Sequence, residues 1–209
     1  MLRVGLTGGI GSGKSTVVRM LREWKLPVIE ADDAAREVTR AGQPAYQEIL
    51  AAFGPRILQP AGEIDRALLA AVVFASAEDL EKLNRIVHPR VIERTSRWLE
   101  EQQRAGEAVA IVEAPLLIEG GYHREFDRLA VVWCRPEQQL ERLAARGMSR
   151  TDAERRIAAQ MPIEEKRGMA NDVIDNSGAL DRTRGEVARW VEKLRLLAGE
   201  SQGGDEAGQ

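Results

Sequence analysis

The sequence predicts an α/β fold, in which a five-stranded parallel sheet is flanked by helices and carries a helical insertion and a lid. Three observations support this prediction. A glycine-rich segment, residues 8–16, directly follows an apolar run near the N-terminus. Short apolar runs then alternate with helical patterns, as in parallel sheets that helices cover on both faces. The second and third runs are separated by roughly 80 residues, far more than a simple crossover needs.

Each apolar run is a predicted strand, because it is short and bounded by helical or turn patterns. The five runs are residues 2–6, 27–29, 109–112, 129–133 and 172–174. A helix is predicted over residues 16–24, where Val17, Met20, Leu21 and Trp24 recur at helical spacing.

Residues 8–16 have the sequence GGIGSGKST and fit the pattern G-x-x-x-x-G-K-[ST] between a predicted strand and a predicted helix. The glycines let backbone N–H groups turn inward and form an anion site at the N-terminus of the helix. Lys14 can then reach the β- and γ-phosphates, and the Ser15 hydroxyl can hold Mg²⁺. Glycine-rich turns also match such patterns by chance, but the flanking strand and helix favour the functional interpretation. We therefore expect the chain to bind a nucleoside triphosphate.

Composition limits the classes of protein to consider. The 209 residues suit one domain with an insertion, or a domain and a half. A formal charge of −3 and the lack of a basic tract argue against nucleic acid as the main partner. Arginine outnumbers lysine 25 to 5, which suits phosphate recognition or simply reflects genome composition.

Cellular location is indicated by three further features. The single cysteine, Cys134, lies in an apolar strand pattern, so no intrachain disulfide can form and a cytoplasmic location is expected. The N-terminus is predicted to be a strand rather than a signal peptide. No apolar run approaches the length that spans a membrane, so we expect no membrane partner.

The long segment between the second and third predicted strands has the patterns of several helices. They cover about residues 33–40, 46–53, 66–75, 77–87 and 91–104. A helical insertion at the carboxyl edge of a parallel sheet lies where a second substrate binds. A purely structural appendage is the alternative.

Helix ends are also marked in the sequence. Thr151 begins a segment, Thr-Asp-Ala-Glu, with the form of a capping box. Residues 199–209 have almost no apolar side chains and are predicted to be a disordered tail. Further helix ends are predicted at Gly42, Gly54, Gly106, Gly147 and Gly199.

Phosphoryl transfer requires positioning and charge neutralisation rather than covalent chemistry from the protein. It needs an acid to orient the acceptor hydroxyl, cations around the γ-phosphate and a closing element that excludes water. Asp32 is the candidate acid, because it follows the second predicted strand and could accept the proton of the acceptor. Alternatively, Asp32 or Asp33 caps the next helix.

The candidate cations are Arg142 and Arg146, which are four residues apart and so share a face of a predicted helix. They precede the polar segment 147–150, an arrangement typical of a lid whose arginines close over a nucleotide. A solvated helix face is the alternative.

Two other segments carry candidate groups. His88, Pro89 and Arg90 end a predicted amphipathic helix, where either charged side chain could contact a phosphate or cap the helix. Glu113 follows the third predicted strand, where many phosphate-loop proteins hold an acid that orients the metal. A polar strand end is the alternative for Glu113.

Taken in this order, the motifs resemble the dephospho-CoA kinase family, whose members are P-loop kinases. The resemblance runs from Leu2 to about Leu196, and its order makes the set far more specific than any single motif after the first. The motifs are residues 5–16, 30–32, 35–38, 83–90, 115–119, 142–146, 156–160 and 170–178.

The resemblance implies ATP-dependent phosphorylation of the ribose 3′-hydroxyl of dephospho-CoA, the final step of coenzyme A synthesis, by a phosphotransferase with an alcohol acceptor and Mg²⁺ as cofactor. Its implied catalytic residues are Asp32, Lys14, Arg142 and Arg146. The implied ATP-binding residues are Gly9, Gly11, Ser12, Gly13, Lys14, Ser15, Thr16, Arg142, Asn176 and Gly178, with Ser15 as the Mg²⁺ ligand. The implied substrate-binding residues are Asp32, Arg36, His88, Arg90 and Leu117.

The resemblance also implies a domain organisation. The kinase domain covers residues 1–198, with a core of about 1–32, 107–145 and 166–198, a substrate-binding helical insertion of about 33–106 and a lid of about 146–165. The partners are then ATP and dephospho-CoA, and the protein is expected to be a monomer or a small homo-oligomer. One departure is Glu30, which stands where the family usually has Asp.

Two other functions share parts of this pattern. A kinase for nucleoside monophosphates or gluconate would have the same loop and lid, and an assay with several acceptors would distinguish it. A GTP-dependent switch protein is suggested by Asp175-x-x-Gly178, but this motif follows the last predicted strand. The sequence also lacks the Asn-Lys-x-Asp motif that recognises guanine.

Overall fold

The computed structural model describes residues 1–203, and its centre is a five-stranded sheet with the order β2-β3-β1-β4-β5. Strand β1 pairs in parallel with β3 and with β4, and β4 pairs in parallel with β5. The strands are β1 (Leu2–Thr7), β2 (Val28–Glu30), β3 (Val109–Glu113), β4 (Arg128–Trp133) and β5 (Asp172–Asp175). All five predicted strands are confirmed, and no end differs by more than one residue.

The carboxyl ends of the paired strands lie at one edge of the sheet, because these strands are parallel. Leu6 of β1 is in register with Glu113 of β3 and with Ala130 of β4. The segments that follow β1, β3, β4 and β5 therefore leave the sheet at the same edge, which is where ligands bind in open α/β sheets.

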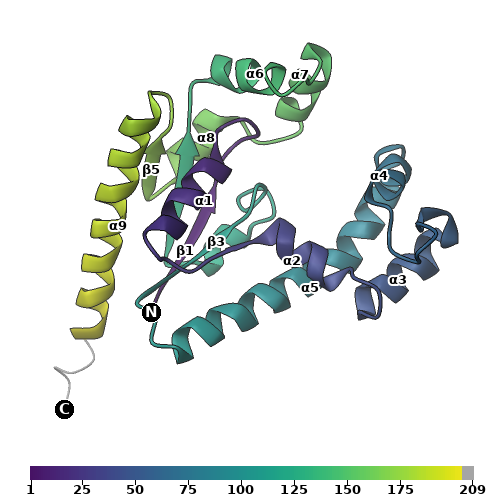
Figure 1. Cartoon of the computed structure of the whole chain (residues 1–209), viewed down its shortest axis with the longest axis horizontal. Helices are drawn as coiled ribbons and strands as arrows, with labels where there is room; N and C mark the ends of the chain where they lie inside the picture. Colours follow the sequence, from purple (N-terminus) through teal and green to yellow (C-terminus); the bar gives the residue numbers. More distant parts are fainter. Residues whose placement is uncertain (204–209) are drawn as a thin grey trace. The chain divides into compact units, whose positions relative to one another are not determined.

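One face of the sheet is covered by α1 (Lys14–Glu23) and α9 (Leu180–Gly203), which also lie beside each other (Figure 1). The predicted stripe of α1 is nearly fully buried at Val17, Met20 and Leu21, but Trp24 is 39% exposed. Trp24 is less buried than the other three because α1 ends at Glu23 and Trp24 lies beyond the helix. This face holds the largest apolar cluster, which includes Val4, Leu6, Ile111, Val132, Trp190 and Leu194.

The opposite face packs against a second apolar cluster. In β4, Ala130 and Val132 belong to the first cluster, whereas Leu129 and Val131 belong to the second, as the alternation of side chains along a strand requires. The second cluster also contains Leu117, Ile118 and Ile163. The helices between β3 and β5 are α6 (Pro136–Ala144), α7 (Arg150–Ala158) and α8 (Ile163–Met169), with a short 3₁₀ helix over Tyr122–Glu125.

The chain divides into two compact units. The first combines Met1–Val28 with the described residues from Glu101 onward, and the second is Ile29–Glu100, which differs from the predicted insertion of 33–106. The second unit is helical, as predicted, and has its own apolar cluster around Ile49, Phe53, Ile57 and Val73. Its helices are α2 (Ala31–Val38), α3 (Pro44–Phe53), α4 (Arg66–Phe74) and most of α5 (Ala77–Arg104), with a 3₁₀ helix over Pro55–Ile57.

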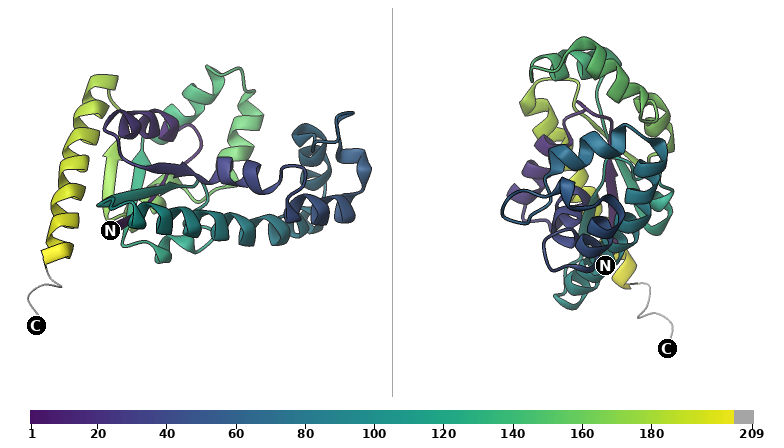
Figure 2. Two further views of the ribbon diagram at one scale, coloured as in Figure 1. Left: turned by 60° about the horizontal axis from the view of Figure 1, so that its bottom comes forward. Right: turned by 90° about the vertical axis from the view of Figure 1, so that its right-hand side faces the viewer.

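Helix α5 corrects one prediction, because a single helix with Pro89 inside it replaces the two predicted helices (Figure 2). A proline in a helix interior removes one backbone hydrogen bond. Leu83, Ile86 and Val87, just before the proline, pack on the apolar cluster of the second unit, and this packing keeps the segment helical. Although α5 is long, neither it nor another helix within residues 1–203 is apolar enough to cross a membrane.

Two predicted helix ends and part of the predicted tail are also wrong. The N-cap of α7 is Ser149, whose Oγ accepts the N–H of Asp152, so the helix begins before the predicted box at Thr151. Gly199 lies inside α9, because buried Ala198 extends the packed face of that helix. The predicted tail therefore overlaps α9 as far as Gly203, and its remainder, 204–209, lies outside the described residues.

Candidate nucleotide-binding site

The glycine-rich segment joins the end of β1 to the start of α1, as predicted. Gly11 and Gly13 have φ angles of 77° and 95°, which are left-handed conformations that favour glycine. Gly13 is the N-cap of α1, so the loop runs directly into a helix N-terminus. This combination of turned backbone and helix N-terminus forms a concave site for an anion.

Side chains from outside the loop bind its carbonyl oxygens. Gln139 Nε2 donates to the oxygen of Ile10 at 2.6 Å, and Asn176 Nδ2 donates to the oxygen of Ser12 at 2.7 Å. Arg142 Nη1 donates to the oxygens of both Gly11 and Ser12, at 3.3 and 3.0 Å. Carbonyls that are bound by other groups do not oppose a phosphate, although the amides of Ile10 and Ser12 are themselves bound, to Gln160 and to the oxygen of Gly9.

Lys14 and Glu113 lie together beside the loop. Lys14 Nζ donates to the oxygen of Gly8 at 3.0 Å and lies 3.9 Å from Glu113 Oε1. Their side chains are only 13% and 6% exposed. The ammonium group is therefore held at the mouth of the loop, where it can approach a phosphate, and Glu113 is more than a polar strand end.

Oxygen atoms beside the loop could hold a magnesium ion that is bound to the phosphates of a nucleotide. Ser15 is exposed in the first turn, and Glu113 supplies a carboxylate at the end of β3. Both offer hard oxygen atoms, and Mg²⁺ in nucleotide sites uses few protein ligands together with phosphate oxygens and water. Within residues 1–203 there is no cluster of three or more acidic, histidine or cysteine side chains that could hold a metal by itself.

The two predicted arginines differ in their positions. Arg142 is bound to the loop and also donates to the oxygen of Asn176 at 2.6 Å. Arg146 lies beyond the end of α6, which closes at Ala144, and it is exposed. The prediction that the two share a helix face is therefore wrong, because the helix ends before Gly147, whose φ is 81°.

Asn176 connects the loop after β5 to the phosphate loop. It is 7% exposed, and its Oδ1 accepts the hydroxyl of Thr183 at 2.9 Å while its Nδ2 holds Ser12. Thr16 lies in the first turn of α1, and Gly178 packs against Arg182. The structure thus brings most of the predicted ATP-binding residues together in the first unit.

Asp32 and Arg36 belong to the second unit. Asp32 is exposed in the first turn of α2, whose N-cap is Glu30, so neither Asp32 nor Asp33 caps this helix. Arg36 Nη1 lies 3.0 Å from Asp33 Oδ1, and both of these side chains are exposed. The capping interpretation of Asp32 is thereby excluded, and the catalytic one stays a prediction.

His88 and Arg90 lie in the interior of α5, so the interpretation that they cap a helix is wrong. The side chains of His88 and Arg90 leave α5 in different directions, because residues two positions apart on a helix do not face each other. His88 is exposed by its accessible surface, and partial desolvation of its imidazole lowers its pKa below the ordinary value. Arg90 lies 3.0 Å from Glu48 and 3.9 Å from Glu93.

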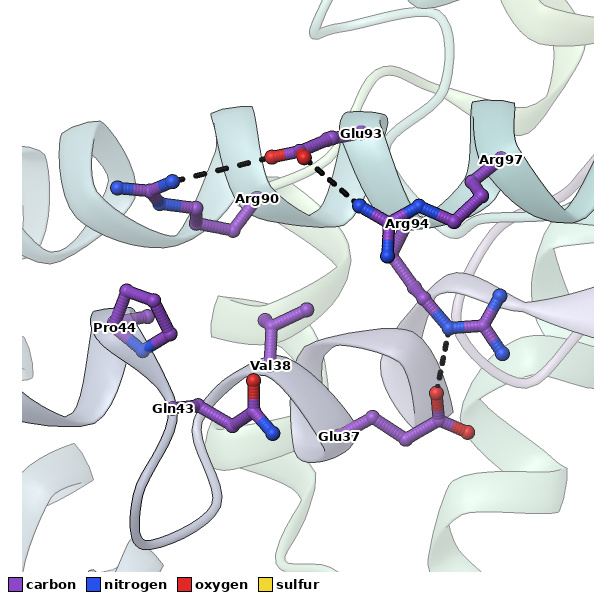
Figure 3. A pocket seen from close by; sticks show the side chains of 9 residues that line it. Glu37, Val38, Gln43, Pro44, Arg90, Glu93, Arg94 and Arg97 are labelled. Atoms are coloured by element: carbon purple, nitrogen blue, oxygen red, sulfur yellow. Dashed lines mark hydrogen bonds and ion pairs between the residues drawn. The ribbon is translucent and has the colours of Figure 1, made fainter.

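Arg90 lines a pocket of about 320 Å³ within the second unit (Figure 3). Arginine and glutamate side chains alternate around it, with Arg94 Nε 2.8 Å from Glu37 and Arg97 3.0 Å from Glu93. The lining residues are Glu37, Val38, Gln43, Pro44, Ala45, Arg90, Glu93, Arg94 and Arg97. Three guanidinium groups give this pocket the chemistry to hold an anionic ligand.

Leu117 does not lie at a surface. It is 4% exposed and packs in the second apolar cluster, close to Gly5 of β1. Its neighbour Leu116 is 48% exposed. The side chain of Leu117 is thus part of the core together with that of Ile118, and its role in substrate binding stays a prediction without support from this position.

Sequence reasoning missed two polar residues that hold the loop. Gln139 is 3% exposed, and the only signal for it is a polar residue on the buried face of an amphipathic helix. Gln160, whose Oε1 accepts the N–H of Ile10 at 2.8 Å, is the last residue of the motif 156–160. Neither contact can be derived from spacing, because each joins residues more than a hundred positions apart.

Comparisons with known proteins agree with this geometry. The model of the dephospho-CoA kinase family matches residues 2–182. The chain belongs to the dephospho-CoA kinase family. It is 48% identical to the dephospho-CoA kinase of Geobacillus kaustophilus over 94% of this chain and 98% of that protein. It is 42% identical to that of Corynebacterium glutamicum, over 93% and 98% of the two chains.

Solved structures agree with the P-loop kinase fold of this family. TT1252 from Thermus thermophilus is 34% identical, with a TM-score of 0.79 over 92% of this chain and 96% of that one. The dephospho-CoA kinase of Campylobacter jejuni is 24% identical, with a TM-score of 0.72 over 93% and 97%, and shows the fold. The chain is thus a kinase whose phosphate loop lies at the carboxyl edge of a parallel sheet.

Proposed function

We propose that this protein transfers the γ-phosphoryl group of ATP to the ribose 3′-hydroxyl of dephospho-CoA, giving coenzyme A and ADP. The observation that carries the proposal is the phosphate loop whose carbonyls are bound outward by Gln139, Arg142 and Asn176. Such a loop, in a member of this family, suits a nucleoside triphosphate as the phosphoryl donor.

In the proposed reaction, the loop amides and Lys14 bind the β- and γ-phosphates. The Ser15 hydroxyl would hold Mg²⁺, and Glu113 would orient the metal and Lys14. When bound, Mg²⁺ neutralises charge on the phosphate oxygens. Lys14 would neutralise part of the remaining charge. Its ion pair with Glu113, at 3.9 Å, keeps the ammonium group near the loop.

Asp32 is the proposed base. Its carboxylate, in the first turn of the helix that follows β2, would accept the proton of the 3′-hydroxyl as the phosphoryl group is transferred. Arg146, exposed just beyond α6, is the proposed lid cation, and Arg142 supports the loop. Asn176 and Gly178 would lie beside the adenine of ATP.

The acceptor is proposed to bind in the second unit. Arg90 and its neighbours in the pocket of Figure 3 can contact the anionic groups of dephospho-CoA, with Arg36 and His88 as further candidates. The arginines of this pocket already face carboxylates, so an anion would compete with Glu37 and Glu93 for them.

The remaining properties are proposals from sequence. We place the protein in the cytoplasm, acting on ATP and dephospho-CoA as a monomer or small homo-oligomer, with neither nucleic acid nor membrane as a partner. The net charge of −3 supports small-molecule substrates rather than nucleic acid.

A coupled ADP-release assay with several acceptors tests the proposal. Dephospho-CoA is expected to be phosphorylated, whereas nucleoside monophosphates and gluconate are not. Strong activity on one of those acceptors alone would contradict the proposed substrate. Guanine nucleotide preferred over ATP in a competition assay would contradict the proposed donor.

The variant Asp32→Asn tests the base. It is expected to lower kcat by about 10²- to 10⁴-fold while MgATP binding, measured by calorimetry, stays unchanged. Asp33→Asn is the matched control, because Asp33 is the neighbouring exposed carboxylate of the same helix turn. Near-normal kcat in Asp32→Asn would show that another group accepts the proton.

A further inference from the structure

The main chain of Ile10, in the phosphate loop, is hydrogen-bonded through both its N–H and its carbonyl oxygen. Its N–H donates to Gln160 Oε1 at 2.8 Å, and its oxygen accepts Gln139 Nε2 at 2.6 Å. Gln139 lies in α6, and Gln160 follows the end of α7. The N–H belongs to the Gly9–Ile10 peptide and the oxygen to the Ile10–Gly11 peptide, so the two glutamine side chains hold the two successive peptide planes that meet at Ile10.

Packing leaves the loop little freedom against α6. A Cβ atom on Gly11 would lie 2.9 Å from the main-chain oxygen of Gln139 and 3.1 Å from its Cα. A Cβ atom on Gly9 would overlap the side-chain amide of the same glutamine. The loop thus fits closely around Gln139, and Gln160 supplies the bond to the N–H of Ile10.

The position of Gln160 is fixed by its chain neighbours. The N–H of Met161 donates to Glu119 Oε1 at 3.0 Å, and Lys166 Nζ lies 2.7 Å from that oxygen. Lys166 is fully buried and also donates to the oxygen of Pro115 at 2.9 Å. Burial raises the pKa of Glu119, but the bonds from Lys166 and Met161 outweigh it and lower that pKa.

We propose that Gln160 is a positioning residue for the nucleotide. Its side-chain carbonyl keeps the N–H of Ile10 bound outside the anion site and, together with Gln139, holds the loop in the conformation in which the following amides bind phosphate. The inference rests on the proposed function only in requiring that ATP occupies this loop. Gln160 acts through the N–H of the Gly9–Ile10 peptide and does not itself touch the reacting atoms.

The variant Gln160→Met tests the proposal, because methionine has a similar shape but lacks the carbonyl oxygen. We expect the Kd of MgATP and the KM for ATP to rise about tenfold, with the KM for dephospho-CoA and the Tm unchanged. Amide hydrogen exchange at Ile10 should become faster. Gln103→Met is the matched control, because Gln103 contacts Arg3 near the amino end of β1.

A conservative variant separates the hydrogen bond from the shape of the side chain. Gln160→Glu keeps an acceptor oxygen, so it should restore slow exchange at Ile10. If Gln160→Met binds MgATP as tightly as wild type, or if Gln160→Glu exchanges as fast as Gln160→Met, the proposal is wrong. If the wild-type protein itself binds no MgATP, the proposed function fails instead.

A double-mutant cycle with Gln139→Met tests whether both glutamines hold the same residue of the loop. Two independent effects would multiply, whereas two effects on the adjoining peptides of Ile10 should be strongly coupled. We expect the double variant to bind MgATP at most about threefold more weakly than the worse single variant. Fully multiplicative losses, with Tm values like wild type, would contradict the shared role.

Discussion

Arg142 Nη1 donates a hydrogen bond of 3.0 Å to the main-chain oxygen of Ser12, so an arginine from α6 supports the phosphate loop on its carbonyl side. The same guanidinium group contacts Gly11 and Asn176. One side chain therefore joins the loop after β1 to the segment after β5, and its planar fork suits three acceptors at once.

Replacement of Arg142 should weaken nucleotide binding. Because a hydrogen bond from a charged group contributes about 1.5–3 kcal/mol, Arg142→Lys is expected to raise the Kd of MgATP about 10- to 100-fold in calorimetry. Lysine lacks the fork and cannot reach all three oxygens. Arg189→Lys should leave this Kd unchanged, because Arg189 is an exposed residue of α9 that pairs with Glu186. Equal binding by wild type and Arg142→Lys would contradict the supporting role.

Glu113→Gln should alter the response to magnesium. The carboxylate lies 3.9 Å from Lys14 and is nearly buried, so its loss removes charge beside the proposed metal. Changes next to a metal ligand typically cost about 10- to 100-fold in metal affinity or activity. We expect a higher Mg²⁺ concentration for half-maximal rate, measured by titration at saturating ATP. Identical Mg²⁺ titrations for variant and wild type would show that Glu113 has only a structural role.

Asp172 should make the stability of the fold depend on acid pH. Burial raises the pKa of this carboxyl, but hydrogen bonds from Arg128 at 2.8 Å and Lys193 at 2.5 Å outweigh it and lower the pKa. A carboxyl whose pKa is lowered by folding stabilises the protein fully above its unfolded value, about 3.9, and loses this contribution as the pH falls through the folded value.

Urea unfolding of Asp172→Asn tests this assignment. At pH 7 the variant should be less stable by about 3 kcal/mol, because a buried pair loses one partner. The difference should shrink below about pH 4, where the unfolded carboxyl is protonated. Glu192→Gln, at an exposed position beside Lys193 in α9, is the control and should show neither effect. A difference that is constant with pH would contradict the role of ionisation.

Pro89→Ala should stabilise the second unit. Alanine restores a backbone N–H inside α5 and removes the clash of the proline ring, a difference of up to about 3 kcal/mol in a helix interior. Pro44→Ala is the matched control, because Pro44 lies in the first turn of α3, where proline is tolerated. Thermal unfolding should show a higher Tm for Pro89→Ala alone. A lower Tm for it would show that the ring itself packs favourably.

Local patterns were sufficient to predict the strands and the phosphate loop. The five apolar runs match the strands because a parallel sheet buried on both faces needs continuous apolar segments. The loop was predictable because its glycines and Lys14 act within a few positions of each other. By contrast, Pro89 misled the prediction of α5, since packing of the helix outweighed the local cost of proline.

The contacts that hold the loop could not be predicted, because they join distant parts of the chain. Gln139, Gln160 and Asn176 each reach the loop from more than a hundred positions away. Their side chains are ordinary in composition, and only the fold brings them to the main chain of Ile10 and Ser12. The burial of Leu117 was also missed, because Leu116, Leu117 and Ile118 are all apolar and only packing in the fold makes Leu116 the exposed one.

Cys134 offers a practical route to observe the proposed lid in solution. It is the single cysteine of the sequence and is fully buried, and burial raises the pKa of its thiol. Thiol-reactive dyes should therefore not label Cys134 in the native protein. Cysteines introduced in pairs, one in α7 and one in α9, would accept fluorophores without prior removal of Cys134, so that energy transfer between them could report opening and closing during turnover.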